Sequence, residues 1–250
     1  MKKLLSIIIC ISPWTSLISD NHPKKRLFDR EEIAAKILGR EDRKYGDHSG
    51  NRVLCRFYNQ GSIGDQSSSF SGVYPLGSGH SYIWEFSPVI AASVLDTSGN
   101  RKRIVSDGLR GLVDSSPEGT PWSFEPLAGY ANPNQENLAM SDNSSTWPST
   151  WPNKDEDWDG EWNGQYGKYV RADQESYFVM DDYYNSEYEF WPDQNDVPES
   201  STESPDDHRR GLGINLEVRG YQWNHPAAED IIIVTYWITN IGSSTLDSVV

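Results

Sequence analysis

The stretch GLGINLEVRGYQW at residues 211–223 alternates between apolar and polar side chains. Its apolar positions are Leu212, Ile214, Leu216 and Val218. The alternating positions Asn215, Glu217 and Arg219 are polar. A period of two predicts a β-strand with one buried face. AEDIIIVTYWITNIG at 228–242 predicts a second, more buried strand, and Asn240–Gly242 predicts the turn that follows it.

The part of the chain from residue 51 onward also favours short strands. NRVLCRFYNQGSIG predicts a strand that ends in a turn at Asn59–Gly61, and residues 79–108 predict paired strands around a turn at Ser98–Asn100. The 10 Trp and 13 Tyr argue for a folded chain, because disordered chains are poor in aromatic residues. We therefore predict a mostly β protein, an antiparallel β-sandwich of the immunoglobulin-like or a related class.

Residues 114–155 show neither a helical nor a strand period. Prolines, polar residues and isolated aromatic residues alternate there, and the following residues up to about 200 are rich in carboxylates and tryptophans. Such a long irregular stretch within a domain is usually functional or a linker. We expect long, irregular, aromatic-rich acidic loops at about 114–200, inserted into a β-rich domain that spans 51–250.

The N-terminus has the features of a secretory signal. Lys2 and Lys3 precede a short apolar run, and a polar exit follows it, so we predict a signal peptide at 1–19 and a secreted or outer-surface location. A lipid attached at Cys10 is the alternative, which the large Ile9 before it disfavours. The run is too short to span a bilayer as a helix.

A charged leader is expected at 20–50. DREEIAAKILG at 29–39 predicts one short helix, with Asp29 as the N-cap and Gly39 at its end. If the signal is removed, Cys55 is the remaining cysteine and cannot form an internal disulfide. Since Cys55 lies among apolar residues on a predicted strand, we expect a buried structural thiol.

The chain ends at Val250 within a strand-like pattern, STLDSVV. We therefore expect a chain truncated at its C-terminus, with further domains of the same polypeptide as its neighbours. The formal net charge of −15 argues against nucleic-acid partners, since phosphate binding requires concentrated Lys and Arg. Extracellular polymers, cations and cell-surface components remain compatible with this charge.

Several stretches together resemble a protein family. NRVLCRFYNQGSIG, WDGEWNGQYG, RADQESYFVMDDY, RRGLGINLEVRGYQW and HPAAEDIIIVTYWITNIGSSTLDSVV follow one another in this order. They resemble the N-terminal region of large uncharacterised secreted proteins of Bacteroidota-like and environmental bacteria, which often carry type IX secretion sorting domains. The resemblance covers about 50–250 and implies secretion, but no catalytic residue.

The segment DEDWDGEWNGQY at 155–166 is a candidate calcium loop. Asp155, Asp157, Asp159 and Glu161 alternate as oxygen ligands around Gly160, in the manner of loops that bind calcium. Tyr166 stands where an EF-hand requires a bidentate Glu, so an EF-hand is excluded. An irregular calcium site, to which Asp173, Asp181 or Asp182 could add ligands, and a solvated acidic turn both stay open.

The other interpretation of this acidic, aromatic region is that it binds or cleaves polysaccharides. A glycoside-active enzyme requires two suitably spaced carboxyls. The candidate carboxyls, which have Tyr and Trp residues as neighbours in the sequence, are Glu175, Asp181, Asp182, Glu187 and Glu189. Nothing in the sequence distinguishes an acid from a nucleophile. We therefore expect no catalytic residue and favour a structural or adhesive module with calcium as its ion. The alternative is a polysaccharide-binding protein or a glycoside-active enzyme.

Overall fold

A computed structural model describes residues 8–11, 42–65, 69–109, 115–117, 119, 122–152, 160–198 and 208–250 of the chain. For 8–11 it describes the backbone. The predicted helix at 29–39 lies outside the described residues, as does most of the predicted signal peptide.

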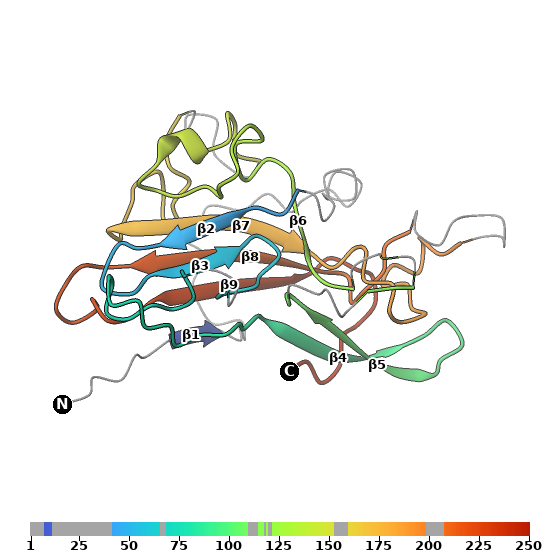
Figure 1. The fold of residues 1–250 in the computed structure, drawn as a ribbon. Helices are drawn as coiled ribbons and strands as arrows, with labels where there is room; N and C mark the ends of the chain where they lie inside the picture. The colour runs from blue at the N-terminus through green and yellow to red at the C-terminus, as the bar shows by residue number, and fades with distance from the viewer. Residues whose placement is uncertain are drawn as a thin grey trace.

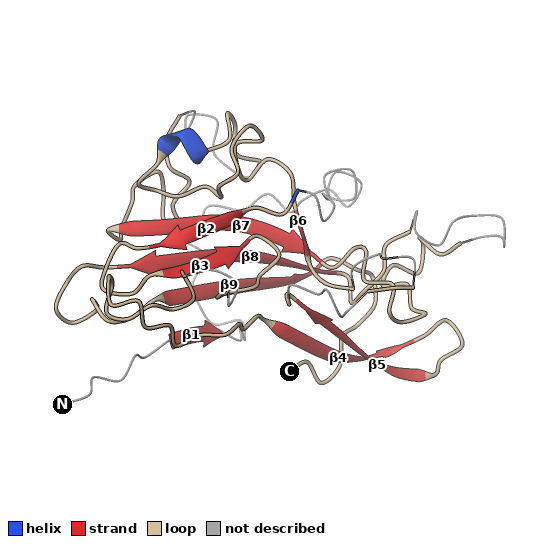
Figure 2. Cartoon of the chain, in the orientation of Figure 1, coloured by secondary structure: helices blue, strands red, loops and turns tan. Residues whose placement is uncertain are grey.

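The chain is mostly β, with antiparallel sheets, as the sequence predicts (Figure 2). The strands are β1 (Ile8–Ile11), β2 (Tyr45–His48), β3 (Cys55–Tyr58), β4 (Val89–Leu95), β5 (Arg101–Asp107), β6 (Glu125–Pro126), β7 (Gln174–Asp181), β8 (Ile214–Gln222) and β9 (Ile233–Asn240). A short 3₁₀ helix, η2, spans Ser144–Thr146. Among the described residues, no helix has the length and apolar character needed to cross a bilayer.

Five strands form the main sheet, in the order β1-β9-β8-β7-β6 (Figure 1). β7, β8 and β9 are antiparallel neighbours, whereas β1 runs parallel to β9. The predicted alternation in β8 is confirmed, because Ile214, Leu216 and Val218 belong to the hydrophobic core. The prediction of a single buried face is wrong, because Asn215 and Arg219 on the other face are buried too. β4 and β5 form the predicted hairpin around Ser98–Asn100, with Leu95 opposite Arg101.

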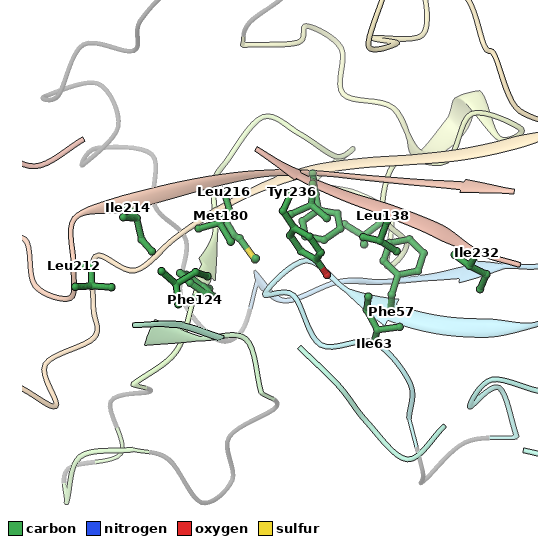
Figure 3. Packing of buried hydrophobic residues seen from close by; sticks show 14 of the residues in the cluster. Phe57, Ile63, Phe124, Leu138, Met180, Leu212, Ile214, Leu216, Ile232 and Tyr236 are labelled. Atoms are coloured by element: carbon green, nitrogen blue, oxygen red, sulfur yellow. The ribbon is translucent and has the colours of Figure 1, made fainter. Parts of the chain in front are cut away.

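A second layer covers the inner face of the main sheet. β2 and β3 pair antiparallel, and bridges Leu54–Val73 and Val73–Ser81 extend this layer beyond β3. The ring of Phe57 stacks on Phe178 of β7 with centroids 6.0 Å apart. Figure 3 shows the core between these elements. The arrangement is sandwich-like, and β2 begins at Tyr45, within the stretch expected to be a leader.

The C-terminal residues pair with the outer edge of β4 instead of forming a strand of their own. Ser93 and Asp247 exchange both backbone hydrogen bonds, at 2.7 and 2.9 Å, and Ala91 and Val250 do the same at 2.9 Å. The chain has one more residue than β4 between these two pairs, which is a bulge. Ser248, inside the bulge, has φ of +52°.

β7 is buried on both faces along its whole length. Phe178 and Met180 point into the core that Figure 3 shows, while Tyr177 and Val179 point into a second hydrophobic cluster on the opposite face. Among the described residues, that opposite face is covered by irregular chain and not by a third sheet (Figure 1). This covering, residues 127–152 and 160–172, is called the loop layer below.

Candidate functional site: the loop layer

Aromatic side chains fasten the loop layer to the outer face of the main sheet. Trp162 is fully buried and contacts Trp151 edge-on, with centroids 5.6 Å apart. Trp151 also contacts Tyr177 of β7 at 5.7 Å, and Tyr130 meets Tyr177 edge-on at 5.5 Å. Large buried rings contribute most of the packing free energy of such a cluster. The loop layer is therefore fixed although its only regular element in the described residues is the short η2.

Glu175 is a polar anchor at the start of β7, and its side chain is buried. Its Oε2 accepts a hydrogen bond from Trp162 Nε1 at 2.7 Å. Its Oε1 accepts bonds from the backbone N–H groups of Arg171, at 2.5 Å, and Ala172, at 3.0 Å. Three donors compensate the burial of one carboxylate, and they hold 162–172 against the sheet.

Arg219 of β8 lies on the same outer face of the main sheet as Glu175 and binds another part of the loop layer. Its Nη1 donates to the carbonyl oxygen of Asn163 at 2.6 Å, and its guanidinium lies 3.6 Å from the ring centroid of Tyr177. Its Nε also contacts Glu217 Oε1 at 3.3 Å. The alternation in the sequence predicts that Arg219 points away from the core, but it does not predict that the residue is buried beneath a loop.

An exposed aromatic surface lies on this supported backbone. Tyr166 and Tyr169 are 62 % and 68 % exposed, and Val170 is also exposed. The stacked pair Tyr221 and Trp223 supports the same loop: Tyr221 Oη donates to Gln165 Oε1 at 2.7 Å, and Trp223 Nε1 donates to the Arg171 carbonyl at 3.1 Å. We call Tyr166, Tyr169, Val170 and the half-buried Trp223 the aromatic surface.

Of the four candidate calcium ligands, Glu161 lies within the described residues and the three Asp residues do not. Glu161 is exposed and lies 3.9 Å from Lys168 Nζ through its Oε1. Asp155, Asp157 and Asp159 lie outside the described residues. Within the described part, no three His, Cys, Asp or Glu side chains gather as a metal site would require. The predicted loop therefore stays a prediction.

The carboxylate oxygens of Asp182 accept hydrogen bonds from the chain, whereas those of a calcium ligand would face the ion. Its Oδ1 accepts from the Ile214 N–H at 2.9 Å, and its Oδ2 accepts from the Leu212 N–H at 2.6 Å and from Ser106 Oγ at 2.8 Å. Burial, and secondly the neighbouring carboxylate of Asp181, raise the pKa of Asp182 to about 7. Asp182 thus joins β5 to the turn before β8.

Asp181 is also used by the fold. It is fully buried, and its Oδ1 lies 2.6 Å from Arg209 Nη1. Burial raises the pKa of Asp181, and the charge of Arg209 opposes this shift. Asp181 Oδ1 and both oxygens of Asp182 bind the chain itself, and Asp181 Oδ2 is buried. We therefore leave both residues out of the proposed calcium ligand set.

The carboxylates considered for glycoside chemistry do not converge on a cleft. Glu175, Asp181 and Asp182 are buried and bonded to the chain, whereas Glu187 and Glu189 are exposed. Glu189 lines a polar cavity of about 190 Å³, together with Asp96, Lys102 and Trp191. Lys102 Nζ donates to the Glu189 carbonyl at 2.7 Å and lies 3.7 Å from Asp96. The cavity therefore combines paired charges with an aromatic wall.

A second, small cavity of about 20 Å³ lies in the core beside His48, Cys55 and Ser176. Cys55 is buried, as predicted, and burial raises the pKa of its thiol to about 12. Burial lowers the pKa of His48 to about 4, and His48 Nε2 lies 3.0 Å from Ser176 Oγ. These groups are neutral and shielded from solvent, so they belong to the core.

The sequence marks Glu175 as one of several candidate carboxyls but gives no signal for its anchoring role, because a single Glu among many carboxylates carries no spacing pattern. Comparison with known proteins adds no assignment: no protein-family model, no curated protein and no solved structure matches the chain.

Proposed function

We propose that this chain is a non-catalytic, structural or adhesive module of a secreted or cell-surface bacterial protein. It contacts an extracellular polymer or cell-surface component through the aromatic surface. The observation that carries this proposal is the exposure of Tyr166 and Tyr169 on a backbone that Glu175 fixes from below. Exposed apolar side chains on a rigid support bind a partner with a smaller ordering cost than those on a mobile loop.

The partners of the buried carboxylates support a non-catalytic role. A general acid or nucleophile must reach a substrate, and the oxygens of Glu175 and Asp182 are instead occupied by donors of the same chain. In contrast, the aromatic surface offers rings with polar neighbours such as Gln165 and Asn224, which is suited to binding and not to bond cleavage.

Calcium is proposed as a structural ion. Asp155, Asp157, Asp159 and Glu161 would hold it, next to the turn that carries Tyr166. Like charges at this density repel one another unless they are solvated, paired or bound to a cation. Of these four, Glu161 has a described cationic neighbour, Lys168, at the long distance of 3.9 Å. An extracellular location would supply calcium at concentrations that weak sites can use.

The second candidate is a polysaccharide-binding or glycoside-active protein. The aromatic surface favours the binding form, since Tyr and Trp faces pack on the apolar faces of sugar rings while polar edges bind hydroxyl groups. The cavity beside Trp191 and Glu189 is the other place where one sugar unit could be held.

Retention on immobilised polymers tests both candidates. The full chain is passed over a panel of polysaccharides and over extracellular matrix, and the eluate is assayed for new reducing ends. We expect retention on at least one polymer with no cleavage, and loss of retention in Tyr166→Ala/Tyr169→Ala. The control, Tyr82→Ala/Trp84→Ala, removes rings that are 63 % and 70 % exposed on the other layer, and it should be retained. Cleavage of a polymer, or no retention on any, contradicts the proposal.

A further inference from the structure

The polar cavity of about 190 Å³ lies between the β4–β5 hairpin and the loop that follows β7. Its walls include Thr97 and Ser98 of the hairpin turn, Lys102 of β5, and Trp191 and Gln194 of the loop. Pockets for drug-sized ligands have volumes of about 300–1,000 Å³. The polar cavity therefore suits one ring-sized molecule and not an oligomer.

Three exposed side chains at this cavity carry hydrogen-bonding groups that the chain does not use. The hydroxyl groups of Thr97 and Ser98 and the side-chain amide of Gln194 make no hydrogen bond within the described residues. Trp191 Nε1 is buried and also lacks a partner there. Hydroxyl groups of a ligand both donate and accept, so they match a set that combines hydroxyl, amide and N–H groups.

The polar cavity also has an apolar part. The indole ring of Trp191 forms one wall, and Leu95, which is 48 % exposed, contributes to another. A sugar ring has the same division of surface, because its C–H groups form apolar faces and its hydroxyl groups surround the edge. Aromatic rings pack on such apolar faces. The combination of walls therefore fits a sugar ring better than a wholly apolar molecule.

Contacts outside the cavity hold its walls in place. Asp96 Oδ1 accepts the Ser98 backbone N–H at 2.9 Å, which fixes the hairpin turn. The guanidinium of Arg210 lies 4.8 Å from the ring centroid of Trp191, and its Nε donates to the Phe190 carbonyl oxygen at 3.2 Å. Walls that are fixed before binding reduce the ordering cost of a ligand.

The charges at the cavity favour an uncharged ligand. Asp96 and Glu189 supply two carboxylates, and Lys102 supplies one ammonium group. Lys102 Nζ already donates to the Glu189 carbonyl oxygen at 2.7 Å and lies 3.7 Å from Asp96 Oδ2. An anionic sugar would meet an excess of negative charge, and a cationic sugar would meet the ammonium group of Lys102.

We propose that the polar cavity binds one uncharged sugar unit, free or at the end of a chain, with its ring on Trp191 and its hydroxyl groups on Thr97, Ser98 and Gln194. The proposed contact with an extracellular polymer supplies the source of the sugar, and the inference rests on the proposed function in this respect. The site itself is separate from the aromatic surface. The β4–β5 hairpin packs on the inner face of the main sheet, whereas the loop layer covers the outer face (Figure 1).

An NMR titration of the labelled full chain tests the cavity directly. Glucose, galactose, mannose and N-acetylglucosamine are added one at a time, with glucuronate and glucosamine as charged probes. We expect saturable shifts of the Trp191 indole N–H and of the Thr97 and Ser98 amides with at least one uncharged sugar. The dissociation constant should be on the order of 1–10 mM. No saturable shift with any uncharged sugar, or tighter binding of a charged probe, would overturn the proposal.

Variants of exposed residues separate binding from folding. Thr97→Val/Gln194→Ala removes a hydroxyl group and an amide from the cavity and should raise the dissociation constant at least fivefold. The matched control Thr150→Val/Gln135→Ala makes the same changes at exposed positions of the loop layer and should bind as the wild type does. Both variants should melt as the wild type does. Equal sugar affinity of the two variants would contradict the assignment to this cavity.

A tetrasaccharide of the bound sugar distinguishes the two sources. If a chain enters by its end, the tetrasaccharide should bind within about threefold of the monosaccharide, because the cavity holds one unit. If free sugar is the ligand, the tetrasaccharide should leave the Trp191 signal unchanged. An affinity that increases more than threefold with length would indicate an extended groove and would contradict the one-unit cavity.

Polymer retention is independent of these shifts. Tyr166→Ala/Tyr169→Ala should keep the sugar-induced shifts at the cavity, and Thr97→Val/Gln194→Ala should keep retention, because a polymer has few ends. No polymer retention with intact cavity shifts would contradict the proposed function alone. Retention without cavity shifts would contradict this inference alone.

Discussion

At the scale of single residues, Glu175 is the main polar link between the loop layer and the main sheet. Its carboxylate is acceptor only, which matches the three donors that converge on it from Trp162, Arg171 and Ala172. An amide in its place would direct an NH₂ group at one or more of these donors. The aromatic surface depends on this arrangement, because the donors belong to the segment that carries it.

We expect Glu175→Gln to destabilise the protein by about 2–3 kcal/mol, the usual cost of losing charge-assisted hydrogen bonds to a buried group. The indole N–H signal of Trp162 should shift, and the amides of Arg171 and Ala172 should lose protection from exchange. Glu136→Gln, at an exposed position of the same layer, is the control and should leave all three signals unchanged. An unaltered urea midpoint in Glu175→Gln would contradict this account.

Because of His48, the free energy of unfolding should decrease as the pH falls below 6.5. Its pKa is about 4 in the folded protein because of burial, against 6.5 for an unperturbed His, so the unfolded chain binds the proton first. The contribution of neutral His48 is present above pH 6.5 and is lost as the pH falls toward 4, to a total of about 3 kcal/mol. Its neighbours Gln174, Gln222, Ser176 and Cys55 carry no charge that would compensate.

The measurement is the free energy of unfolding of the wild type and of His48→Gln between pH 7.5 and pH 4. The difference between the two proteins should change by about 3 kcal/mol in this window, with the wild type losing more stability in acid. Asp182, whose raised pKa makes the folded state bind more protons, contributes the opposite slope in both proteins and cancels in the difference. Parallel pH curves would contradict the assignment to His48.

At the scale of elements, the C-terminal segment protects β4 through two residue pairs. Asp247→Pro removes the N–H that bonds to the Ser93 carbonyl at 2.9 Å. We expect a loss of about 1–3 kcal/mol and faster exchange of the Ser93 amide, since proline cannot donate to the pairing. Ser248→Gly is the opposite test: glycine tolerates the φ of +52°, so this variant should be at least as stable as the wild type. Equal melting of both variants would show that the segment is not held there.

Whether the sequence predicts an element depends on the order of apolar and polar residues along it. β8 places apolar residues in the core on one face and Asn215, Glu217 and Arg219 on the other, so its alternation predicts it although Asn215 and Arg219 are buried too. The hairpin of β4 and β5 is predicted from its turn residues. β7 has four consecutive apolar residues, Tyr177 to Met180, which remove the alternation, and the burial of its outer face depends on a loop layer whose packing no local pattern encodes. Asp182 depends on contacts with Ser106 and with the turn before β8, which are distant in the sequence. The donors to Glu175 are close in the sequence but lie in an irregular segment without a period.

At the scale of the whole molecule, two surfaces of the main sheet have different uses. The inner face packs on β2, β3 and the hairpin of β4 and β5, and it stabilises the fold (Figure 1). The outer face supports the loop layer, which presents the aromatic surface and adjoins the predicted calcium loop. The molecule is thus a sandwich-like scaffold that holds one irregular layer in a fixed shape.

The most direct test is the melting temperature of the full chain with 10 mM calcium and with chelator. A site with the millimolar or tighter affinity of extracellular modules should raise the melting temperature by at least about 3 °C. Asp155→Asn/Asp157→Asn should abolish this shift, and Glu136→Gln/Glu189→Gln, which removes the same charge elsewhere, should keep it. Equal melting of the wild type with calcium and with chelator would contradict a calcium-stabilised loop layer.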